Sequence, residues 1–187
     1  MSATTLLIAA NVAAFALEGA LGDAFVRPLV LWPLGGGFAP WQLVTYAFMH
    51  ASLAHVAFNM IGLWSFGKDL ERLWGVGRYV SYYLACALSA GLTQLAVSSL
   101  SGTHYPTAGA SGAVFGLLLA FAIFFPDRRV MLLFPPVVLR APVFAVAYGI
   151  LELVLGVTGT EEGVAHFAHL GGMAGGLLVL WSWRRAD

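Results

Sequence analysis

Long apolar stretches alternate with short polar segments along the whole chain. Six of them are near the length of a membrane span, at residues 4–21, 53–68, 78–99, 108–125, 141–157 and 164–183. A helix needs about 20 residues to cross the hydrocarbon core of a bilayer. Because lipid offers no hydrogen-bond partners, each stretch must pair its own backbone groups, which a helix does. The pattern predicts an all-α polytopic membrane protein, a bundle of six transmembrane helices.

The composition agrees with a membrane protein and excludes several function classes. Of the 187 residues, 60% are hydrophobic and 10% are charged, against about 25% charged residues in soluble domains. The net charge of zero gives no electrostatic case for nucleic acid as a partner. Cys86 is the single cysteine, which excludes an intrachain disulfide and a thiolate metal cluster. We expect one domain over residues 1–187, with the first stretch retained as a span rather than removed as a signal peptide.

Basic residues indicate how the helices are oriented. With six spans, eight of the nine basic residues fall on one side of the membrane: Lys68, Arg72, Arg78, Arg128, Arg129, Arg140, Arg184 and Arg185. Only Arg27 falls on the other side. Since basic residues favour the cytoplasmic side, both termini are expected in the cytoplasm.

Two segments between the stretches are long enough to need their own interpretation. Residues 22–52 carry six aromatic side chains, together with Pro33 and Pro40. Composition favours a loop lying on the lipid headgroups, and the alternative is a structured insertion that braces an active site. Residues 130–140 contain two adjacent prolines, which break helices, so this segment is expected to lie along the cytoplasmic face.

Strongly polar side chains interrupt three of the stretches. His55 and Asn59 are four apart and share a helix face. Ser111 lies in the fourth stretch, and His166 and His169 lie in the sixth. Polar residues within membrane spans are rare and usually functional. These three parallel spans place their polar groups at a similar depth, about 5–10 Å below the outer interface at 1.5 Å per residue.

Small residues suggest how these groups meet. Glycines spaced four apart occur in the fourth and sixth stretches: Gly112 with Gly116, and Gly172 with Gly176. Such spacing lets membrane helices approach closely. If the two glycine faces meet, Ser111 and His169 come within hydrogen-bond distance. A neutral imidazole could then take the serine proton as a general base and return it to a leaving amine.

Each of these residues also has a structural interpretation. Ser111 alone is typical of packing between helices, His169 of an interhelical hydrogen bond, and the His55–Asn59 pair of helix support. Glu152 is a carboxylate within the fifth stretch, and we expect it to pair helices or to lie at an interface. Two further histidines fall between stretches and are expected to be structural: His50 and His104. The agreement in depth among the first three sites favours chemistry over packing.

The motifs around these residues resemble those of the rhomboid family of intramembrane serine proteases, in its basic six-helix, bacterial-like form. The chain reads GASG at 109–112, HVAFN at 55–59 and AHLGGMAGG at 168–176. These correspond to the family patterns G-x-S-G, H-x-x-x-N and A-H-x-x-G-x-x-x-G, in the same order. The segments WQLVTYAFMHASLAH at 41–55 and LERLWG at 70–75 are also similar to the family.

The resemblance implies a Ser–His dyad without a third acid. Ser111 would be the nucleophile, and His169, rather than His166, would be the general base. The side chains of His55 and Asn59, with the backbone N–H of Ser111, would stabilise the oxyanion. No cofactor is expected, and no metal is expected because the five histidines lack a carboxylate partner at ligand spacing.

Two further residues bear on the resemblance. Phe115, four residues after Ser111, would pack against the ring of His169, where some family members have tyrosine. Gln42 stands where some bacterial members have arginine. The resemblance therefore does not say how the 22–52 segment is anchored in this chain.

The function expected from these residues is intramembrane proteolysis of transmembrane segments of other proteins. The expected location is a bacterial or archaeal cytoplasmic membrane, with the active site opening to its outer side. The expected partners are the transmembrane-segment substrates and the lipid bilayer. The oligomeric state is not predicted. The alternatives are an inactive rhomboid-like binder or chaperone of membrane helices and a small transporter. A metalloprotease is disfavoured because no H-E-x-x-H motif occurs and no carboxylate is expected to accompany the histidine pair.

Overall fold

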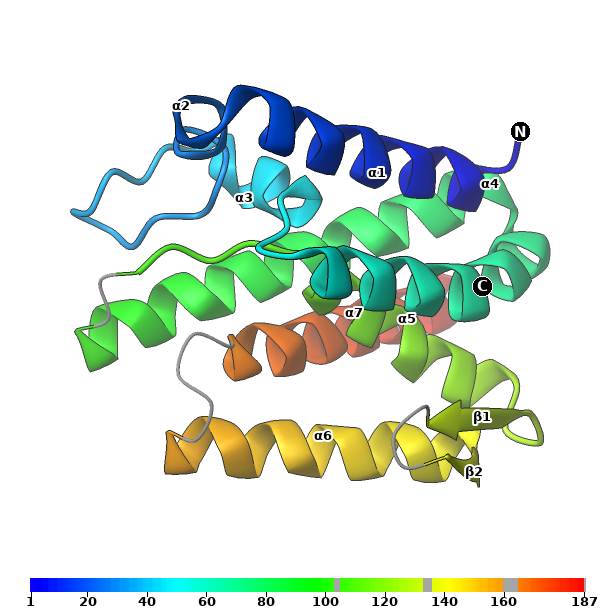
Figure 1. The fold of residues 1–187 in the computed structure, drawn as a ribbon. Coiled ribbons are helices and arrows are strands. Elements are labelled where there is room, and N and C mark those ends of the chain that lie inside the picture. Colours follow the sequence, from blue (N-terminus) through cyan, green and yellow to red (C-terminus); the bar gives the residue numbers. More distant parts are fainter. Residues whose placement is uncertain (103–104, 133–135, 160–164, 187) are drawn as a thin grey trace.

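A bundle of roughly parallel and antiparallel helices makes up the protein (Figure 1). The computed structural model describes residues 1–102, 105–132, 136–159 and 165–186. Its elements are α1 (Ala3–Leu21), α2 (Asp23–Val26), α3 (Gln42–Thr45), a 3₁₀ turn η1 (Tyr46–Phe48), α4 (Leu53–Ser101), α5 (Ser111–Phe124), β1 (Arg129–Leu132), β2 (Val137–Arg140), α6 (Ala141–Thr158) and α7 (His166–Ala186). In Figure 1, α1 lies along one edge of the bundle and α6 along the opposite edge.

Helix α4 consists of two helical arms joined at a bend. Gly75 has φ 75° and ψ 166°, outside the helical region, and glycine adopts positive φ without steric cost. The bend divides α4 into arms at 53–74 and 76–101, which coincide with the second and third apolar stretches. By length and composition, three of the described helices can cross a membrane, namely α1, α4 and α6.

Helix α5 begins later than the sequence predicts. The apolar stretch starts near residue 108, but the helix starts at Ser111 and has 14 residues, about 21 Å at 1.5 Å per residue. Before it, the chain is extended at Thr107, which exchanges two backbone hydrogen bonds with Leu31. This extended segment runs inward from one end of the bundle before α5 starts (Figure 1). Ser111 therefore lies at a helix start within the bundle.

A short β-hairpin joins α5 to α6, and the all-α expectation is wrong for this segment. Strands β1 and β2 pair antiparallel, with Arg129 opposite Arg140 and Leu132 opposite Val137. Valine has a high propensity for strands, and the prolines at 135–136 disfavour helix. The hairpin ends where the amide of Ala141 donates to the carbonyl of Arg128, at 2.8 Å.

Glycines allow α5 and α7 to pack almost backbone to backbone. A Cβ on Gly172 would meet the carbonyl oxygen of Gly112, and a Cβ on Gly116 would meet the thiol of Cys86. The same Cβ on Gly116 would lie 3.0 Å from the carbonyl oxygen of Gly172. The prediction that the two glycine faces meet is therefore confirmed.

The start of α1 is attached to α4 by a buried carboxylate. Glu71 accepts hydrogen bonds from the amides of Ala3 and Thr4 and from the Thr4 hydroxyl, at 2.7–2.9 Å. The first amides of a helix have no partners within the helix, and its N-terminus carries partial positive charge. The Glu71 carboxylate accepts hydrogen bonds from these amides and places a negative charge at the helix N-terminus. It therefore positions α1 against α4.

Both chain termini lie at the same end of the bundle, together with the bend of α4 and the hairpin (Figure 1). Basic residues are held at this end by contacts across the sequence. The Asp69 carboxylate lies 3.3 Å from Arg72 and 4.0 Å from Arg128. Arg78 stacks on the ring of Trp183. The opposite end holds the polar groups described next.

Candidate active site

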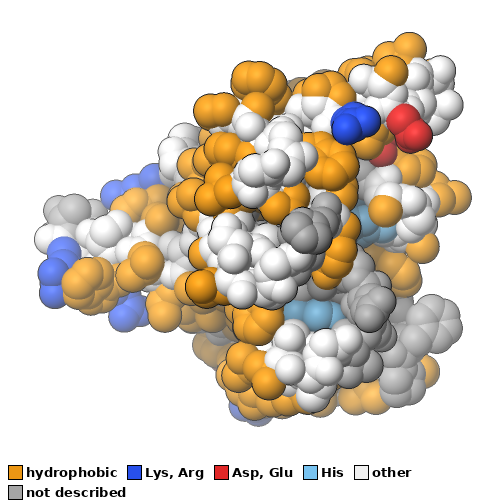
Figure 2. Space-filling model, turned by 90° about the vertical axis from the view of Figure 1, so that its left-hand side faces the viewer, with side chains coloured by type: hydrophobic (Ala, Val, Ile, Leu, Met, Phe, Trp, Pro, Cys, Tyr) orange, Lys and Arg blue, Asp and Glu red, His pale blue; other side chains and the backbone are white. Residues whose placement is uncertain are grey.

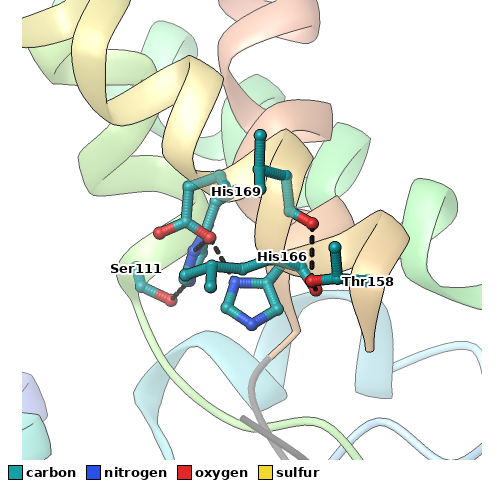
Figure 3. A network of polar contacts seen from close by, with 7 residues as sticks. Ser111, Thr158, His166 and His169 are labelled. Atoms are coloured by element: carbon teal, nitrogen blue, oxygen red, sulfur yellow. Dashed lines mark hydrogen bonds and ion pairs between the residues drawn. The ribbon is translucent and has the colours of Figure 1, made fainter. Parts of the chain in front are cut away.

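A serine and a histidine from two different helices form a hydrogen bond. Ser111 is the first residue of α5, and His169 lies one turn into α7. The Ser111 hydroxyl oxygen is 2.7 Å from Nε2 of His169 (Figure 3). His169 is 9% exposed. The contact follows from the glycine packing of α5 on α7, and it gives the imidazole direct access to the serine proton.

Aromatic stacking fixes the plane of the His169 ring. The ring of Phe115 lies parallel to it, with centroids 4.4 Å apart and an interplanar angle of 3°. Phe115 is one helical turn after Ser111 on α5, so both side chains face α7. Tyr148 of α6 contacts the Phe115 ring in turn, at 5.9 Å. The imidazole is thereby held on one face while its edge points at the hydroxyl.

A carboxylate accompanies the histidine pair, contrary to the expectation from the sequence. Glu152 of α6 is buried, and its Oε2 accepts a 2.7 Å hydrogen bond from Nδ1 of His166. The same oxygen lies 2.8 Å from Nδ1 of His169. That second contact is short but is not aligned as a hydrogen bond, so Nδ1 of His169 has no hydrogen-bond partner among the described residues. Figure 3 shows the side chains of His166 and His169 close to each other.

A carboxylate thus lies beside the expected pair of Ser111 and His169, where the sequence predicted none. The statement that the histidines lack a carboxylate partner is wrong for the same reason. Glu152, His166 and His169 each offer a ligand atom, and these atoms lie within 4.8 Å of one another. They are a group that could hold a metal ion.

His55 lies beside the segment that leads into Ser111. A Cβ on Gly109 would come within 2.7 Å of Nε2 of His55, and Gly109 has φ 127°. Only glycine therefore fits at this position. The start of α4 is fixed by Ser52, whose hydroxyl accepts a 3.1 Å hydrogen bond from the His55 amide. The structure thus brings His55 to residues 107–110, the segment before Ser111 that we call the serine loop.

Asn59 lies one turn after His55 on α4 and is buried. Its Nδ2 donates to the carbonyl oxygen of His55 at 3.0 Å. A side-chain amide nitrogen has two donors, and this bond within the helix uses one of them. Among the described contacts, none joins Asn59 directly to Ser111 or His169.

The 22–52 segment is a structured insertion rather than a loop lying free on the surface. Gln42 is 2% exposed. Its Oε1 accepts from the Trp32 amide at 3.1 Å, and its Nε2 donates to the carbonyls of Pro28 and Gly37 at 3.4 and 3.3 Å. The glutamine therefore anchors the segment from within, without the arginine that some bacterial family members have.

The insertion is also joined to the serine loop. The Tyr46 carbonyl accepts a 2.9 Å hydrogen bond from the Gly109 amide. The Tyr46 hydroxyl donates to the Ala87 carbonyl on α4, at 2.7 Å. The insertion thus connects the serine loop to the second arm of α4, and it braces the site, as the second interpretation of the segment required.

His50, expected to be structural, packs in the same insertion. Its ring contacts that of His55 edge to face, with centroids 5.0 Å apart, and its amide donates to Glu18 of α1 at 3.0 Å. Burial and the neighbouring imidazole lower the pKa of His50 from 6.5 to about 4, although a contact with the Phe48 carbonyl opposes the shift. His50 is therefore neutral at pH 7. His104 lies outside the described residues.

Comparison with known proteins identifies the fold that carries these groups. A family model described as "Rhomboid domain" matches residues 38–186. The chain belongs to the rhomboid family. The match contains all three rhomboid motifs found in the sequence, and it covers α3 to α7.

Individual relatives agree with this membership. The chain is 34% identical over 139 residues to Rhomboid protease GluP of Bacillus subtilis, covering 74% of this chain and 25% of that protein. It is 33% identical over 142 residues to the mitochondrial Rhomboid protein 1 of Saccharomyces cerevisiae, covering 75% and 41%. It is 32% identical over 117 residues to Rhomboid protease GlpG of Enterobacter, covering 62% and 41%. The chain thus spans less than half the length of these rhomboid relatives, which are bacterial and mitochondrial.

The contact that sequence reasoning missed in this rhomboid is Glu152 with the two histidines. Glu152 lies six residues before the last residue of α6, Thr158, whereas His166 is the first residue of α7. Spacing along the chain therefore does not place the two side chains at one level, and their contact depends on how the two helices are aligned.

Proposed function

We propose that this rhomboid is an intramembrane serine endopeptidase that uses Ser111 as its nucleophile and His169 as its general base. The observation that carries the proposal is the 2.7 Å contact between the Ser111 hydroxyl and Nε2 of His169. A nucleophile and a base within hydrogen-bond distance, with the base oriented by further groups, is the arrangement that nucleophilic catalysis requires. Two of the relatives are named as proteases, which supports the same chemistry.

In the proposed reaction, Oγ of Ser111 attacks the carbonyl carbon of a peptide bond while its proton moves to Nε2 of His169. The tetrahedral intermediate collapses when the imidazolium returns this proton to the leaving amine, and the acyl group stays on the serine as an ester. Water then attacks the ester carbonyl, gives one proton to His169, and releases a carboxylic acid and the free Ser111 hydroxyl. Ser–His hydrolases use this sequence of proton transfers.

Glu152 is proposed as a positioning residue for His169. A base that accepts at Nε2 must carry its proton on Nδ1 when neutral. The Glu152 oxygen at 2.8 Å from Nδ1 favours that tautomer, and it favours the imidazolium that forms during attack. Phe115 stacking on the ring restricts its rotation in the same way. Ser111 therefore faces an imidazole prepared to accept a proton.

Three groups are proposed to stabilise the oxyanion: the side chains of His55 and Asn59 and the backbone N–H of Ser111. Ser111 is at the first helical position of α5, whose N-cap residue Ala110 makes no side-chain cap hydrogen bond. Amides at a helix start lack partners within the helix and favour negative charge. His55 at Gly109 supports a second donor on the other side of the serine loop.

The chain is an integral membrane protein, as its family and its apolar helices indicate. Large apolar side chains are exposed along the lateral faces of the bundle, as contact with hydrocarbon requires; on α6 they are Val143, Val146, Ile150, Leu151, Leu153, Val154 and Val157. We propose six spans with both termini in the cytoplasm, the site opening to the outer side of a bacterial or archaeal cytoplasmic membrane, and transmembrane segments as substrates.

Cleavage by matched serine variants tests this proposal. The purified chain, reconstituted in vesicles with a model transmembrane substrate, should cleave it, and Ser111→Ala should abolish cleavage while remaining folded. Ser182→Ala removes an exposed hydroxyl near the other end of the bundle and should cleave at the wild-type rate. Cleavage by Ser111→Ala at the wild-type rate would contradict the assignment. A folded wild type that binds the segment and never cleaves it would favour the non-catalytic binder.

A further inference from the structure

We propose that Glu152, His166 and His169 form a binding site for a divalent transition-metal ion, Zn²⁺ by preference, and that the bound ion inhibits the protease. The proposal rests on the proposed function of His169 as the general base. It concerns regulation of the site and requires no metal in the reaction itself. Three observations carry it: the donor set, the contact between Nδ1 of His169 and Glu152 that is not aligned as a hydrogen bond, and the two roles of the His169 ring nitrogens.

The three side chains present a donor set that suits zinc. Each side chain offers one ligand atom, and these atoms lie within 4.8 Å of one another; Nδ1 of each histidine lies beside the carboxylate oxygen Oε2. Two imidazoles and one carboxylate, with a fourth position left for water, are a known arrangement for Zn²⁺. Mg²⁺ and Ca²⁺ prefer oxygen ligands, so they should bind poorly here.

The site is built from buried groups on two packed helices. Glu152 is 7% exposed on α6, and His166 and His169 are 5% and 9% exposed on α7. A tetrahedral ion with bonds of about 2.0–2.1 Å separates its ligand atoms by about 3.3 Å. The Oε2 atom now lies 2.7 and 2.8 Å from the two nitrogens. Seating the ion would therefore require each nitrogen to move about half an ångström away from Oε2.

The contact of Nδ1 of His169 is compatible with a bound ion. This nitrogen lies 2.8 Å from Oε2 of Glu152, in a contact that is not aligned as a hydrogen bond. A metal ion between the carboxylate and the two nitrogens would replace this contact with coordination bonds, and it would compensate the negative charge of a buried carboxylate.

Metal binding at Nδ1 would stop the proposed reaction through the tautomer of His169. A neutral imidazole that ligates a metal through Nδ1 carries its proton on Nε2. Nε2 would then donate to the Ser111 hydroxyl, 2.7 Å away, and could not accept the serine proton. The same contact that activates Ser111 in the metal-free protein would keep it inactive in the metal-bound protein.

Metal binding and proteolysis are measured separately on the purified full chain, with any affinity tag removed. Calorimetric titration with Zn²⁺ in the absence of substrate should show one ion per chain. Co²⁺, used as a spectroscopic probe, should give the visible absorption of a tetrahedral site. Zn²⁺ should reduce substrate cleavage with the midpoint seen in the binding titration, EDTA should restore it, and Mg²⁺ should have no effect.

Two histidine variants locate the ion. His166→Gln keeps a group that can hydrogen-bond Glu152 but removes a ligand, so zinc binding and inhibition should each weaken by at least about tenfold, relative to the variant's own metal-free activity. His50→Gln removes a buried histidine outside the cluster and should retain stoichiometric binding.

The possible outcomes separate this inference from the proposed function. Proteolysis that Zn²⁺ does not inhibit, or His166→Gln binding zinc as tightly as the wild type, would overturn the metal site alone. Zinc binding that depends on His166 in a wild type without proteolysis would contradict the proposed function, and with it the inhibitory role, while supporting the ion's location.

Discussion

At the scale of single residues, His169 connects the groups on which the proposed chemistry depends. One ring nitrogen contacts Ser111, the other faces Glu152, and one ring face lies on Phe115. The imidazole is thus restrained on three sides by residues of α5 and α6. A base held in this way loses little freedom when it accepts the serine proton, which favours the transition state.

The proposed oxyanion donors give a prediction about turnover. Asn59→Ala should lower kcat by about 10²–10³, equivalent to about 2.7–4 kcal/mol, because a donor to the developing oxyanion acts mainly in the transition state. The Asn59 bond to the His55 carbonyl offers a purely structural role instead. That role predicts a lower melting temperature, with activity falling only as the folded fraction falls. Measuring kcat and melting temperature on the same preparations separates the two, and a normal kcat per folded molecule would remove Asn59 from the site.

His50 gives a prediction about pH and stability. Its pKa is about 4 in the folded protein and 6.5 unfolded, because burial and the adjacent His55 disfavour its charged form. Between these values the unfolded chain binds a proton that the folded chain does not, so stability should fall as pH falls from about 6.5 to 4. Besides His55, the carboxylate of Glu18 faces His50. His50→Gln should flatten the melting temperature across this window, and an unchanged pH dependence in that variant would assign the effect to another group.

Residue spacing in the sequence predicted much of this site. The i, i+4 spacing placed Phe115 on the face of Ser111, and the glycine pairs correctly indicated that their helices meet. Glu152 was missed because its contact depends on how α6 and α7 are aligned, which the connection between them determines. The motifs lie within single helices and carry no information about that alignment.

At the scale of the elements, the contact between α5 and α7 determines where the serine and histidine meet. Ser111 is adjacent to Gly112, and His169 is three residues before Gly172. A change in the distance between these helices would therefore act directly on the 2.7 Å contact. The extended segment before α5 and the 22–52 insertion brace the same place from the other side, through the Gly109 and Leu31 hydrogen bonds.

A pair of glycine variants tests this dependence. Gly172→Ala should destabilise the protein by about 1–3 kcal/mol, the usual cost of overpacking, because its Cβ would meet the backbone carbonyl of Gly112. Cleavage should fall more than the folded fraction does. Gly19→Ala, where a Cβ would meet nothing within 4 Å, should be neutral or slightly stabilising, since alanine favours helix. Thermal unfolding in detergent compares the two, and equal melting temperatures would show that α5 and α7 do not pack this closely.

Two features of the elements could not be read from apolar patterns. The fourth stretch begins near residue 108, but small apolar residues are compatible with both helix and extended chain. Pairing of Thr107 with Leu31 selects the extended form at Thr107, and the helix begins only at Ser111. The hairpin of β1 and β2 was missed for a similar reason. Its prolines indicated where helix stops, but antiparallel pairing is a contact between segments that periodicity does not report.

At the scale of the whole molecule, the two ends of the bundle differ in chemistry. One end holds both termini, the bend of α4 and the hairpin (Figure 1), and eight of the nine basic residues lie in or near these segments along the sequence. The other end, viewed directly in Figure 2, has histidine atoms visible between hydrophobic side chains. The segregation of charge agrees with the proposed orientation, in which the basic end faces the cytoplasm. It also separates the proposed catalytic end from that side.

Labelling with a fluorophosphonate tests the central claim most directly, because this probe reacts with a serine only when a base activates it. The purified wild type should be modified at Ser111, as mapped by peptide mass spectrometry. His169→Ala should lose the label while remaining folded, and His166→Gln should keep it, since His169 alone contacts the Ser111 hydroxyl among the histidines described. Modification at another residue, or undiminished labelling of Ser111 in His169→Ala, would contradict the account.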